Sequence, residues 1–403
     1  MSRSPFDAIV IGARCAGSPV AMLLARKGYR VLVADKATFP SDTISTHLIH
    51  PPGVETLSRW GILPRVVATG CPPIDTYAFD FGPFTIAGAP GTEESPVAYA
   101  PRRTQLDTLL VEAASESGAE VREGFTVEEI VIEGGRVTGI RGHGRAGQSV
   151  TERARIVVGA DGRHSILAKA VAPEQYNERP PLLAAYYTYW SGLPMNGRFE
   201  AYIRPYRSFA AWPTNDDRTL VIAGWPYAEF EANKKDVEGN YHKVIDLAPA
   251  FAERMRGAKR EERFVGTAVP GYFRKPFGPG WALLGDAGYN KDFITAFGIT
   301  DAFRQAELCA TALDRSLSGD LSFDDAMGEY QAARDEHAAA RFEFTCQLAT
   351  QDPPPEDLQK ILAAVHGNRD AMNDFARVNS GVISPAEFFS PENVGRIFEA
   401  AAR

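Results

Sequence analysis

The sequence predicts an α/β fold in which one parallel sheet is assembled from three separate parts of the chain. A second sheet is inserted between two of these parts, and helices follow at the C-terminal end. Three observations predict this arrangement. Residues 8–35 read as a strand–helix–strand unit with a glycine-rich turn. Two later apolar runs, 155–158 and 281–284, each end in a glycine–aspartate turn. The stretch between them, about 180–270, is dense in Tyr and Trp and alternates like sheet strands.

Bulk composition narrows the class of protein. The 403 residues suffice for two packed cores or one discontinuous core, and 44% hydrophobic with 23% charged residues is typical of a globular protein in water. The four cysteines are widely spaced, which predicts neither a metal site nor a disulfide framework and favours a reducing cytoplasm. A net charge of −8 argues against nucleic-acid or anionic-membrane partners. The apolar run at 8–11 is too short for a signal peptide or a membrane span.

The first motif, Gly-Ala-Arg-Cys-Ala-Gly at 12–17, lies between a buried strand and a helix expected over about 19–27. Gly12 permits a tight turn, Gly17 permits close contact between helix and sheet, and the helix N-terminus offers N–H groups to a pyrophosphate. Asp35 ends the second strand, where an acid binds ribose hydroxyls. The pattern predicts a Rossmann-type dinucleotide site; the alternative is a turn with a structural role only.

Arg14 replaces the middle glycine of the motif. Its side chain can turn outward while the backbone still fits the cofactor, or its guanidinium can cap the pyrophosphate in a bidentate geometry. The sequence leaves both hypotheses open.

The second and third motifs are Gly-Ala-Asp-Gly-Arg-His-Ser at 159–165 and Gly-Asp-Ala-Gly-Tyr at 285–289, which leads into 296–300 and a helix. Asp161 and Asp286 can each hold a ribitol or ribose hydroxyl, although an acid at such a place is more commonly a helix N-cap. The later helix start can face the pyrimidine edge of an isoalloxazine and stabilise the charge of a reduced flavin. Together the motifs predict FAD.

Motif order and spacing resemble those of the class A FAD-dependent monooxygenases, the para-hydroxybenzoate hydroxylase-like family, up to about residue 320. Roughly 125 residues separate the second and third motifs, which is room for an inserted domain. The Arg-Thr-Gln-Leu-Asp segment at 103–107 resembles the family's FAD-contacting arginine segment. The resemblance implies a GR2-like FAD-binding domain over 1–178 and 271–345 and a substrate-binding sheet domain over 179–270. Residues of about 75–100 can contribute to that sheet, and 346–403 form a C-terminal helical region.

The motifs and the resemblance together define the expected cofactor contacts. They are Gly12, Ala13, Arg14, Ala16, Gly17, Asp35, Lys36, Arg103, Asp161, Gly285, Asp286, Ala296, Phe297, Gly298 and Ile299. The chain departs from the family near the flavin ring. Phe293 lies near the position where the family usually has a proline, and Tyr289 occupies a position where the family often has His. Gly298-Ile-Thr300 replaces a Gly-x-Asn-like turn, and Gln305 replaces an acid that is frequent in the following helix.

The resemblance implies that NAD(P)H reduces FAD and that a flavin hydroperoxide, formed with O2, hydroxylates a small aromatic or otherwise planar substrate. No second nucleotide fingerprint is present, which fits a transiently bound NAD(P)H. Candidate catalytic residues are His47 as a base, Phe293 beside the flavin, and Tyr202 with Arg204, which alternate and can share one sheet face. Structural roles in the sheet's core are the alternative for the rings. The tail can close the substrate pocket or form a homodimer contact.

Two other classes stay open. One is an FAD-dependent reductase or dehydrogenase similar to the geranylgeranyl reductase branch, which does not insert oxygen. The other is a flavin-binding protein without catalysis, disfavoured by the large aromatic region. A flavin-dependent halogenase is also disfavoured, because the sequence has no Trp-x-Trp-x-Ile-Pro stretch and no convincing catalytic lysine in the expected region.

Overall fold

The computed structural model describes residues 5–402. Its first sheet contains the three predicted parts of the chain, and the predicted α/β fold is confirmed. Five parallel strands run in the order β20-β10-β1-β2-β7, with β19 antiparallel at the edge. Their bounds are β1 (Phe6–Ile11), β2 (Val31–Asp35), β7 (Glu120–Glu123), β10 (Ser149–Gly159), β19 (Phe277–Gly278) and β20 (Trp281–Leu283).

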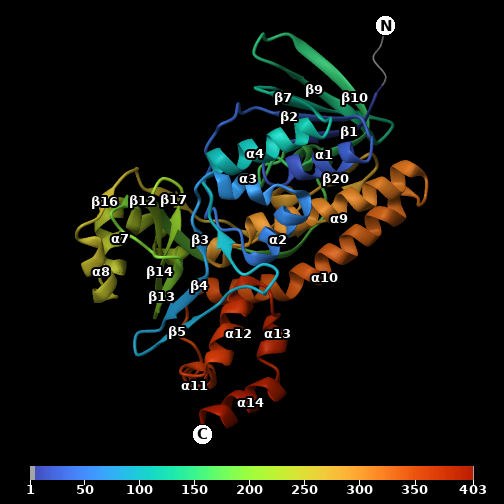
Figure 1. Ribbon diagram of the computed structural model, residues 1–403. Helices are drawn as coiled ribbons and strands as arrows, with labels where there is room; N and C mark the ends of the chain where they lie inside the picture. The colour runs from blue at the N-terminus through green and yellow to red at the C-terminus, as the bar shows by residue number, and fades with distance from the viewer. Residues whose placement is uncertain (1–4, 403) are drawn as a thin grey trace.

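Helices cover one face of this sheet and a β-meander covers the other (Figure 1). Helix α1 (Gly17–Arg26) lies between α4 (Arg103–Glu116) and α9 (Gly298–Ser318), with α2 (Pro51–Trp60) and α3 (Leu63–Ala68) beside them. The meander joins β8 (Thr126–Glu133) and β9 (Arg136–His143) to the first half of β10 and packs with α5 (Ile166–Val171). Alanines and branched apolar residues dominate both layers, so the central strands β1, β2 and β20 and the end of β10 are buried on both sides, as is typical of a parallel sheet, while the edge strand β7 is not.

The second sheet follows the order β16-β12-β15-β14-β13-β4-β5, and β17 also pairs with β12. The strands are β4 (Thr76–Asp80), β5 (Thr85–Gly88), β12 (Leu183–Ser191), β13 (Arg198–Arg204), β14 (Arg207–Thr214), β15 (Arg218–Pro226), β16 (Lys259–Arg260) and β17 (Val265–Thr267). Strand β4 pairs with β13 in parallel, so residues 76–88 belong to this sheet although they precede it by about a hundred positions. The exact domain boundaries stay a prediction.

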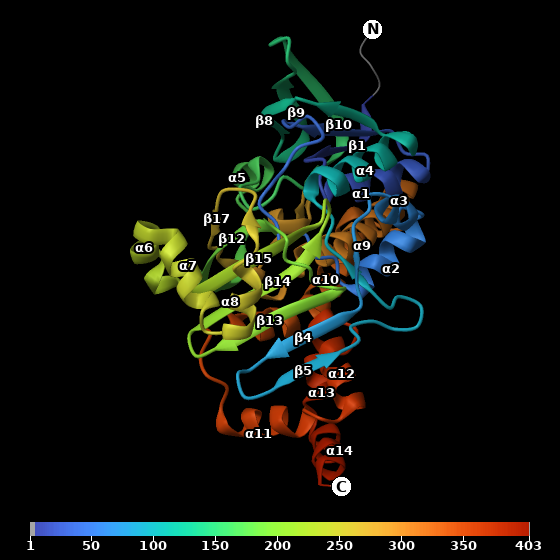
Figure 2. The same cartoon turned by 60° about the vertical axis from the view of Figure 1, so that its left-hand side comes forward.

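The inserted region also contains three short helices that the sequence analysis did not predict. They are α6 (Phe230–Asn233), α7 (Val237–Ile245) and α8 (Pro249–Met255), seen beside the sheet in Figure 2. Asp236 caps α7 by accepting the N–H of Gly239 at 2.9 Å, and Pro249 begins α8. Tyr241 and Phe251 are completely buried against the sheet. The sequence analysis interpreted the whole stretch of about 180–270 as sheet because Tyr and Trp are dense in it, and so missed these helices.

The two faces of the second sheet differ, and we name each after one residue. The Trp225 face carries Trp225, Ala223 and the residues opposite them on the neighbouring strands, and it packs on α7 and α8. The Tyr189 face carries Tyr187, Tyr189, Trp212 and Leu220 and is turned toward Leu48 and Ala296 of the first domain and toward the C-terminal helices.

The C-terminal region is helical as expected. The long helix α10 (Phe323–Ala349) packs along α9 and ends before the proline run at 353–355. Helix α12 (Arg369–Ser380) packs on β4 and β5. Helices α11 (Glu356–Val365), α13 (Pro385–Phe388) and α14 (Pro391–Ala401) pack on α12 and on one another, at the opposite end of the molecule from β8 and β9 (Figure 2).

The ends of β1, β10 and β20 meet at one edge of the first sheet. Gly12 has a φ of +99°, and a Cβ there would lie 2.5 Å from the Ala160 carbonyl oxygen. A Cβ on Gly17 would lie 1.7 Å from the Gly12 oxygen, and one on Gly285 would lie 2.9 Å from the Ala16 Cβ. The three motifs therefore touch one another through positions that only glycine can occupy.

Substitution of Gly12 tests this packing. Gly12→Ala should abolish FAD binding and lower the melting temperature, because both the positive φ and the clash with Ala160 must be relieved. Gly28→Ala is the matched control, since Gly28 also has a positive φ of +89° but a Cβ at that position would have no atom within 4 Å; it should cost only about 1 kcal/mol. Equal effects of the two substitutions on FAD affinity would contradict the close-contact account.

Candidate functional site

The glycine-rich turn is fixed by Asp35. One carboxylate oxygen accepts the N–H of Ala13 at 2.7 Å, and the other accepts the N–H of Ala37 at 2.7 Å. Ser18 adds a hydrogen bond to the Ala13 carbonyl at 2.7 Å. Each carboxylate oxygen of Asp35 keeps acceptor capacity for a ribose hydroxyl, while Lys36 next to it is exposed.

Arg14 and Arg103 both pair with Asp107, whose side chain is completely buried. Both terminal nitrogens of Arg14 donate to protein acceptors, among them the Ser41 hydroxyl at 2.9 Å. This leaves the Arg14 guanidinium little capacity to cap a pyrophosphate. Arg103 instead lies within electrostatic range of Asp286 and so connects the first motif with the third.

Only one carboxylate oxygen of Asp161 is hydrogen-bonded to the start of α5. Its Oδ2 accepts the N–H of Ile166 at 2.7 Å, while Oδ1 is buried and has no hydrogen-bond partner among the described residues. Burial raises the pKa of this carboxyl above its ordinary value. A buried acceptor without a donor is costly, so a hydroxyl or N–H of a bound group would satisfy it.

Asp286 is accessible to solvent, yet protein atoms surround it closely. Burial raises the pKa of its carboxyl, and the cations Lys291, Arg103 and Arg163 oppose that shift. An accessible acid enclosed in this way is placed to bind a hydroxyl-bearing ligand. The glycine contacts, the orphaned Asp161 oxygen and the accessible Asp286 together fit FAD.

Five side chains hold the backbone of 283–288, which carries Asp286. Every one of these contacts comes from a residue outside the motif. The hydroxyl of Tyr330 donates to the Leu283 oxygen (3.1 Å), the Gly285 N–H donates to Gln305 (2.9 Å), and Tyr272, Arg274 and Arg334 donate to the carbonyls of Asp286 (2.8 Å), Ala287 (2.9 Å) and Gly288 (3.2 Å). Gln305, which departs from the family's frequent acid, is thus a structural partner of the loop. Sequence analysis missed this support because its members come from β18 (Gly271–Arg274), α9 and α10.

The expected flavin-ring segment lies at the N-terminus of α9. Gly298 is exposed there, and Ala296 just before it has a φ of +54°, an uncommon backbone conformation for alanine. Phe297 is buried between His50, at 4.2 Å between ring centroids, and the Arg341 guanidinium at 4.0 Å. Its side chain is therefore committed to packing, and its backbone is what remains for a cofactor. Ile299 packs in the core, and Phe293 begins the partly accessible turn η4 (Phe293–Thr295).

His47 is brought to the Tyr189 face. Its Nε2 is hydrogen-bonded to the Tyr189 hydroxyl, its Nδ1 is buried without a partner among the described residues, and its φ of +61° is strained. Burial, helped by Arg103 and Arg102, lowers the pKa of His47, so the imidazole is neutral at pH 7. Burial likewise raises the pKa of Tyr189.

Two neighbours complete this group. The Arg102 guanidinium lies 4.0 Å from the Tyr189 ring centroid and pairs with Asp42 and Glu262. Tyr187 accepts the N–H of Ser45 through its hydroxyl at 3.4 Å. Sequence analysis weighed both tyrosines only as members of the aromatic region; the alternation of β12 with His47 opposite is the signal that singles them out.

Tyr202 and Arg204 do not join this group. Their register on β13 places both on the Trp225 face, where Tyr202 stacks on Phe209 at 4.3 Å and Arg204 pairs with Asp80. The two residues do share one face, as their alternation predicts. That face is the wrong one for the proposed pocket, because the side of a strand that meets a partner depends on the whole sheet.

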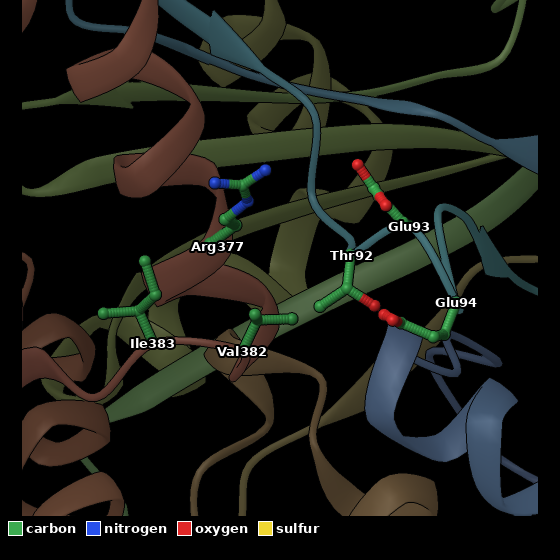
Figure 3. Close-up of a pocket in the computed structure, with 6 residues that line it drawn as sticks. All are labelled: Thr92, Glu93, Glu94, Arg377, Val382 and Ile383. Atoms are coloured by element: carbon green, nitrogen blue, oxygen red, sulfur yellow. The ribbon is translucent and has the colours of Figure 1, made fainter.

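A surface pocket of about 390 Å³ lies elsewhere, between the loop at 92–94 and the end of α12 (Figure 3). It is lined by Thr92, Glu93, Glu94, Arg377, Val382 and Ile383. Arg377 already donates to Gly91 at 3.1 Å and to Asp374 at 3.1 Å. The pocket contains no residue of the three motifs and belongs to the packing of α12 on this loop.

Comparison with known proteins agrees with the motif assignment. A family described as "FAD binding domain" matches residues 6–237. The tryptophan 2-halogenase of Chondromyces crocatus is 24% identical over 98% of this chain and 78% of its own length. Protein FixC of Salmonella typhi is 32% identical, over 42% of this chain and 39% of its own length.

Two solved structures share the fold over nearly the whole chain. The myxobacterial chondrochloren halogenase CndH has a TM-score of 0.80 and 22% identity, covering 99% of this chain and 97% of that one. PqsL, a probable FAD-dependent monooxygenase from Pseudomonas aeruginosa, has a TM-score of 0.71 and 20% identity, covering 94% of this chain and 100% of that one.

The chain therefore belongs to the FAD-binding domain family, and its fold is that of the class A flavin monooxygenases. It is an FAD-dependent oxidoreductase. Within residues 5–402, no helix is both long and apolar enough to cross a membrane.

The support of the Asp286 loop can be tested by removing one hydroxyl. Tyr272→Phe should weaken FAD binding about 2- to 10-fold, because the Asp286 carbonyl loses one hydrogen bond worth about 1 kcal/mol and the loop loosens. Titration of the apoprotein with FAD, followed by flavin fluorescence, measures this. Tyr206→Phe, at an exposed tyrosine, is the control; equal affinities of the two variants would contradict the loop-support account.

Asp292, at the start of η4, makes stability depend on pH. Its Oδ1 accepts the N–H of Ile294 at 2.9 Å, its Oδ2 is buried without a partner among the described residues, and burial raises its pKa from 3.8 to about 7. The folded chain therefore binds the Asp292 proton more tightly than the unfolded chain. Its contribution to stability is present below about pH 4 and is lost as the pH rises to about 7.

The Asp292→Asn variant should lack this loss. Between pH 4 and 7 the difference in unfolding free energy between wild type and variant should shift by up to about 4 kcal/mol in favour of the variant as the pH rises. Urea unfolding at several pH values measures it. If the unfolding free energies of wild type and variant change with pH in parallel between pH 4 and 7, Asp292 is not protonated in the folded chain.

Proposed function

We propose that this protein is an NAD(P)H-dependent monooxygenase that hydroxylates a small aromatic or otherwise planar substrate. The observation that carries the proposal is the His47–Tyr189 pair, which stands where the 45–48 loop of the FAD domain meets the aromatic face of the second sheet. A phenolic group and a neutral base in contact at this place suit the activation of a hydroxylated ring.

In this proposal, FAD binds at the edge of the first sheet where the three motifs meet. The 12–17 turn and the N-terminus of α1 bind the pyrophosphate together with Arg103, and Asp35 binds ribose hydroxyls. Asp286 and the free oxygen of Asp161 would accept hydrogen bonds from hydroxyl groups of the ribityl chain or the ribose. The N–H groups at Gly298 and Ile299 face the pyrimidine edge, where the helix dipole favours negative charge. FAD supplies the electron transfer and the oxygen chemistry when bound.

The net reaction consumes substrate, O2, NAD(P)H and one proton and yields hydroxylated substrate, water and NAD(P)+. The chain's own contribution is a proton path. With its proton on Nδ1, His47 accepts the Tyr189 O–H at Nε2, so Tyr189 can in turn accept a proton from a substrate hydroxyl. The Arg102 guanidinium over the Tyr189 ring stabilises the charge that develops there.

Halogenation is the second candidate, supported by the likeness to a tryptophan 2-halogenase and to CndH. One feature of this chain argues against it. The lysine that is closest in sequence to the expected flavin-ring segment is Lys291, and it is buried in an ion pair with Asp301. A lysine held in this way does not offer a free amine to an oxidised halogen.

The test is a screen of phenolic substrates with purified flavoprotein, recording NAD(P)H oxidation and oxygen uptake together. Substrate-stimulated consumption of both in a 1:1 ratio, with a hydroxylated product in the presence of chloride and bromide, supports the proposal. A halogenated product supports the second candidate. Substrate turnover that continues without oxygen supports the reductase alternative.

The proton path predicts a specific loss. Tyr189→Phe should lower turnover of a phenolic substrate roughly 100-fold, because the proton acceptor is removed, while FAD content stays as in the wild type. Tyr186→Phe is the matched control, since the neighbouring Tyr186 lies on the Trp225 face. An unchanged turnover in Tyr189→Phe would exclude Tyr189 from the reaction.

A further inference from the structure

The Tyr189 face bears a partly accessible apolar patch in the middle of the sheet. Ala201, Ala210 and Ile222 are direct cross-strand neighbours on β13, β14 and β15, and all three are partly exposed. Phe199, Ile203 and Ser208 surround them with similar exposure. These six residues are called the apolar patch below.

On the opposite face of β14 and β15, the corresponding residues are buried. Phe209, Ala211, Val221 and Ala223 alternate with the patch residues along β14 and β15, and each is at most 2% exposed. An antiparallel sheet commonly has one face packed on a core and the other accessible to solvent. In the middle of β14 and β15 the Tyr189 face stays partly exposed although C-terminal helices lie on that side, so protein atoms cover it incompletely.

The patch contains no charge. Every charged residue of β13 and β14 between 198 and 207 falls on the Trp225 face: Arg198, Glu200, Arg204 and Arg207. The residues on the Tyr189 face of β12 to β15 are all uncharged along four segments. These segments run from Ala185 to Tyr189, from Phe199 to Ile203, from Ser208 to Trp212 and from Leu220 to Gly224, and their residues on this face are Ala, Ile, Phe, Ser, Gly, Leu, Trp or Tyr. A carboxylate on the patch would lose its hydration without gaining a cation from the patch residues; on this face the Arg102 guanidinium lies at the ring of Tyr189, where the hydroxyl is expected.

Polar groups bound the patch at its two ends. Toward the FAD domain, Ile222 is the cross-strand partner of Tyr187, beside Tyr189 with its His47 partner. Toward the C-terminal helices, the Ser208 hydroxyl accepts a hydrogen bond from Gln351 at 2.6 Å, and the Gln351 Oε1 is buried without a partner among the described residues. A ligand that lies on the patch can therefore meet one hydroxyl-binding group near Tyr189 and one acceptor at Gln351.

We propose that the apolar patch binds the substrate's ring system and selects uncharged, lipophilic aromatic molecules with a ring hydroxyl over their carboxylated analogues. The hydroxyl is directed to Tyr189, and the rest of the molecule extends along β14 toward Gln351. This inference rests on the proposed function and narrows its substrate class. Arg204, a candidate catalytic residue of the sequence analysis, lies on the other face of the sheet and takes no part in this site.

The test compares 1-naphthol with 5-hydroxy-1-naphthoate, which share the ring system and the hydroxyl and differ in one carboxylate; this carboxylate is on the other ring, away from the hydroxyl and from Arg102 at Tyr189. Each is titrated into the FAD-loaded protein, and the change in the flavin absorption spectrum gives the dissociation constant without turnover. Naphthol should bind at least tenfold more tightly. Equal or tighter binding of the carboxylate would overturn the proposal.

Two substitutions locate the site. Ala210→Phe should fill the patch and weaken naphthol binding at least tenfold, and Ile222→Ala, a smaller change, should weaken it several-fold through lost contact. FAD content and the melting temperature serve as folding controls, and Tyr206→Phe, at an exposed position next to the strand, should bind like the wild type. Unchanged naphthol affinity in folded Ala210→Phe and Ile222→Ala would also overturn the proposal. Absence of oxygen-dependent NAD(P)H oxidation with tight naphthol binding would instead contradict the proposed function alone.

Discussion

The close approach of the Gly12 turn to the backbone of Ala160 and Asp161 is the contact on which the site depends. It brings the ends of β1 and β10 together, and the packing of Gly285 on Ala16 adds the end of β20. Three segments that are separated by more than a hundred residues thus form one edge of one sheet. A side chain at any of these glycines would push the strands' ends apart, and the acids Asp35, Asp161 and Asp286 would no longer converge.

The supporting contacts are divided between two kinds of residue. Backbone geometry places the glycine turns, whereas long side chains from other elements hold the acidic loops: Asp107 ties Arg14 and Arg103 together, and Tyr272, Arg274 and Arg334 bind successive carbonyls after β20. The substrate side is organised by the sheet's alternation. One face packs on α7 and α8, and the other, with Tyr187, Tyr189 and the apolar patch, is turned toward the FAD domain and the C-terminal helices.

Sequence reasoning predicted what depends on neighbouring residues. The strand–turn–helix of 8–35 and the acid after each buried strand are local patterns, so the FAD-binding fold could be predicted from them. Tyr202 and Arg204 show the limit, because their alternation is local but the face they occupy is set by pairing with β14 and β4. The role of Gln305 and the pairing of Arg14 with Asp107, 93 residues away, likewise depend on tertiary contacts.

The measurement that tests the central claim most directly is isotope transfer. A phenolic substrate that stimulates NAD(P)H oxidation is converted under ¹⁸O2 in ordinary water, with chloride and bromide present, and the product is analysed by mass spectrometry. A monooxygenase predicts a product with one added ¹⁸O atom. A product that carries oxygen from water, a halogen in place of oxygen, or no new atom at all would contradict the account.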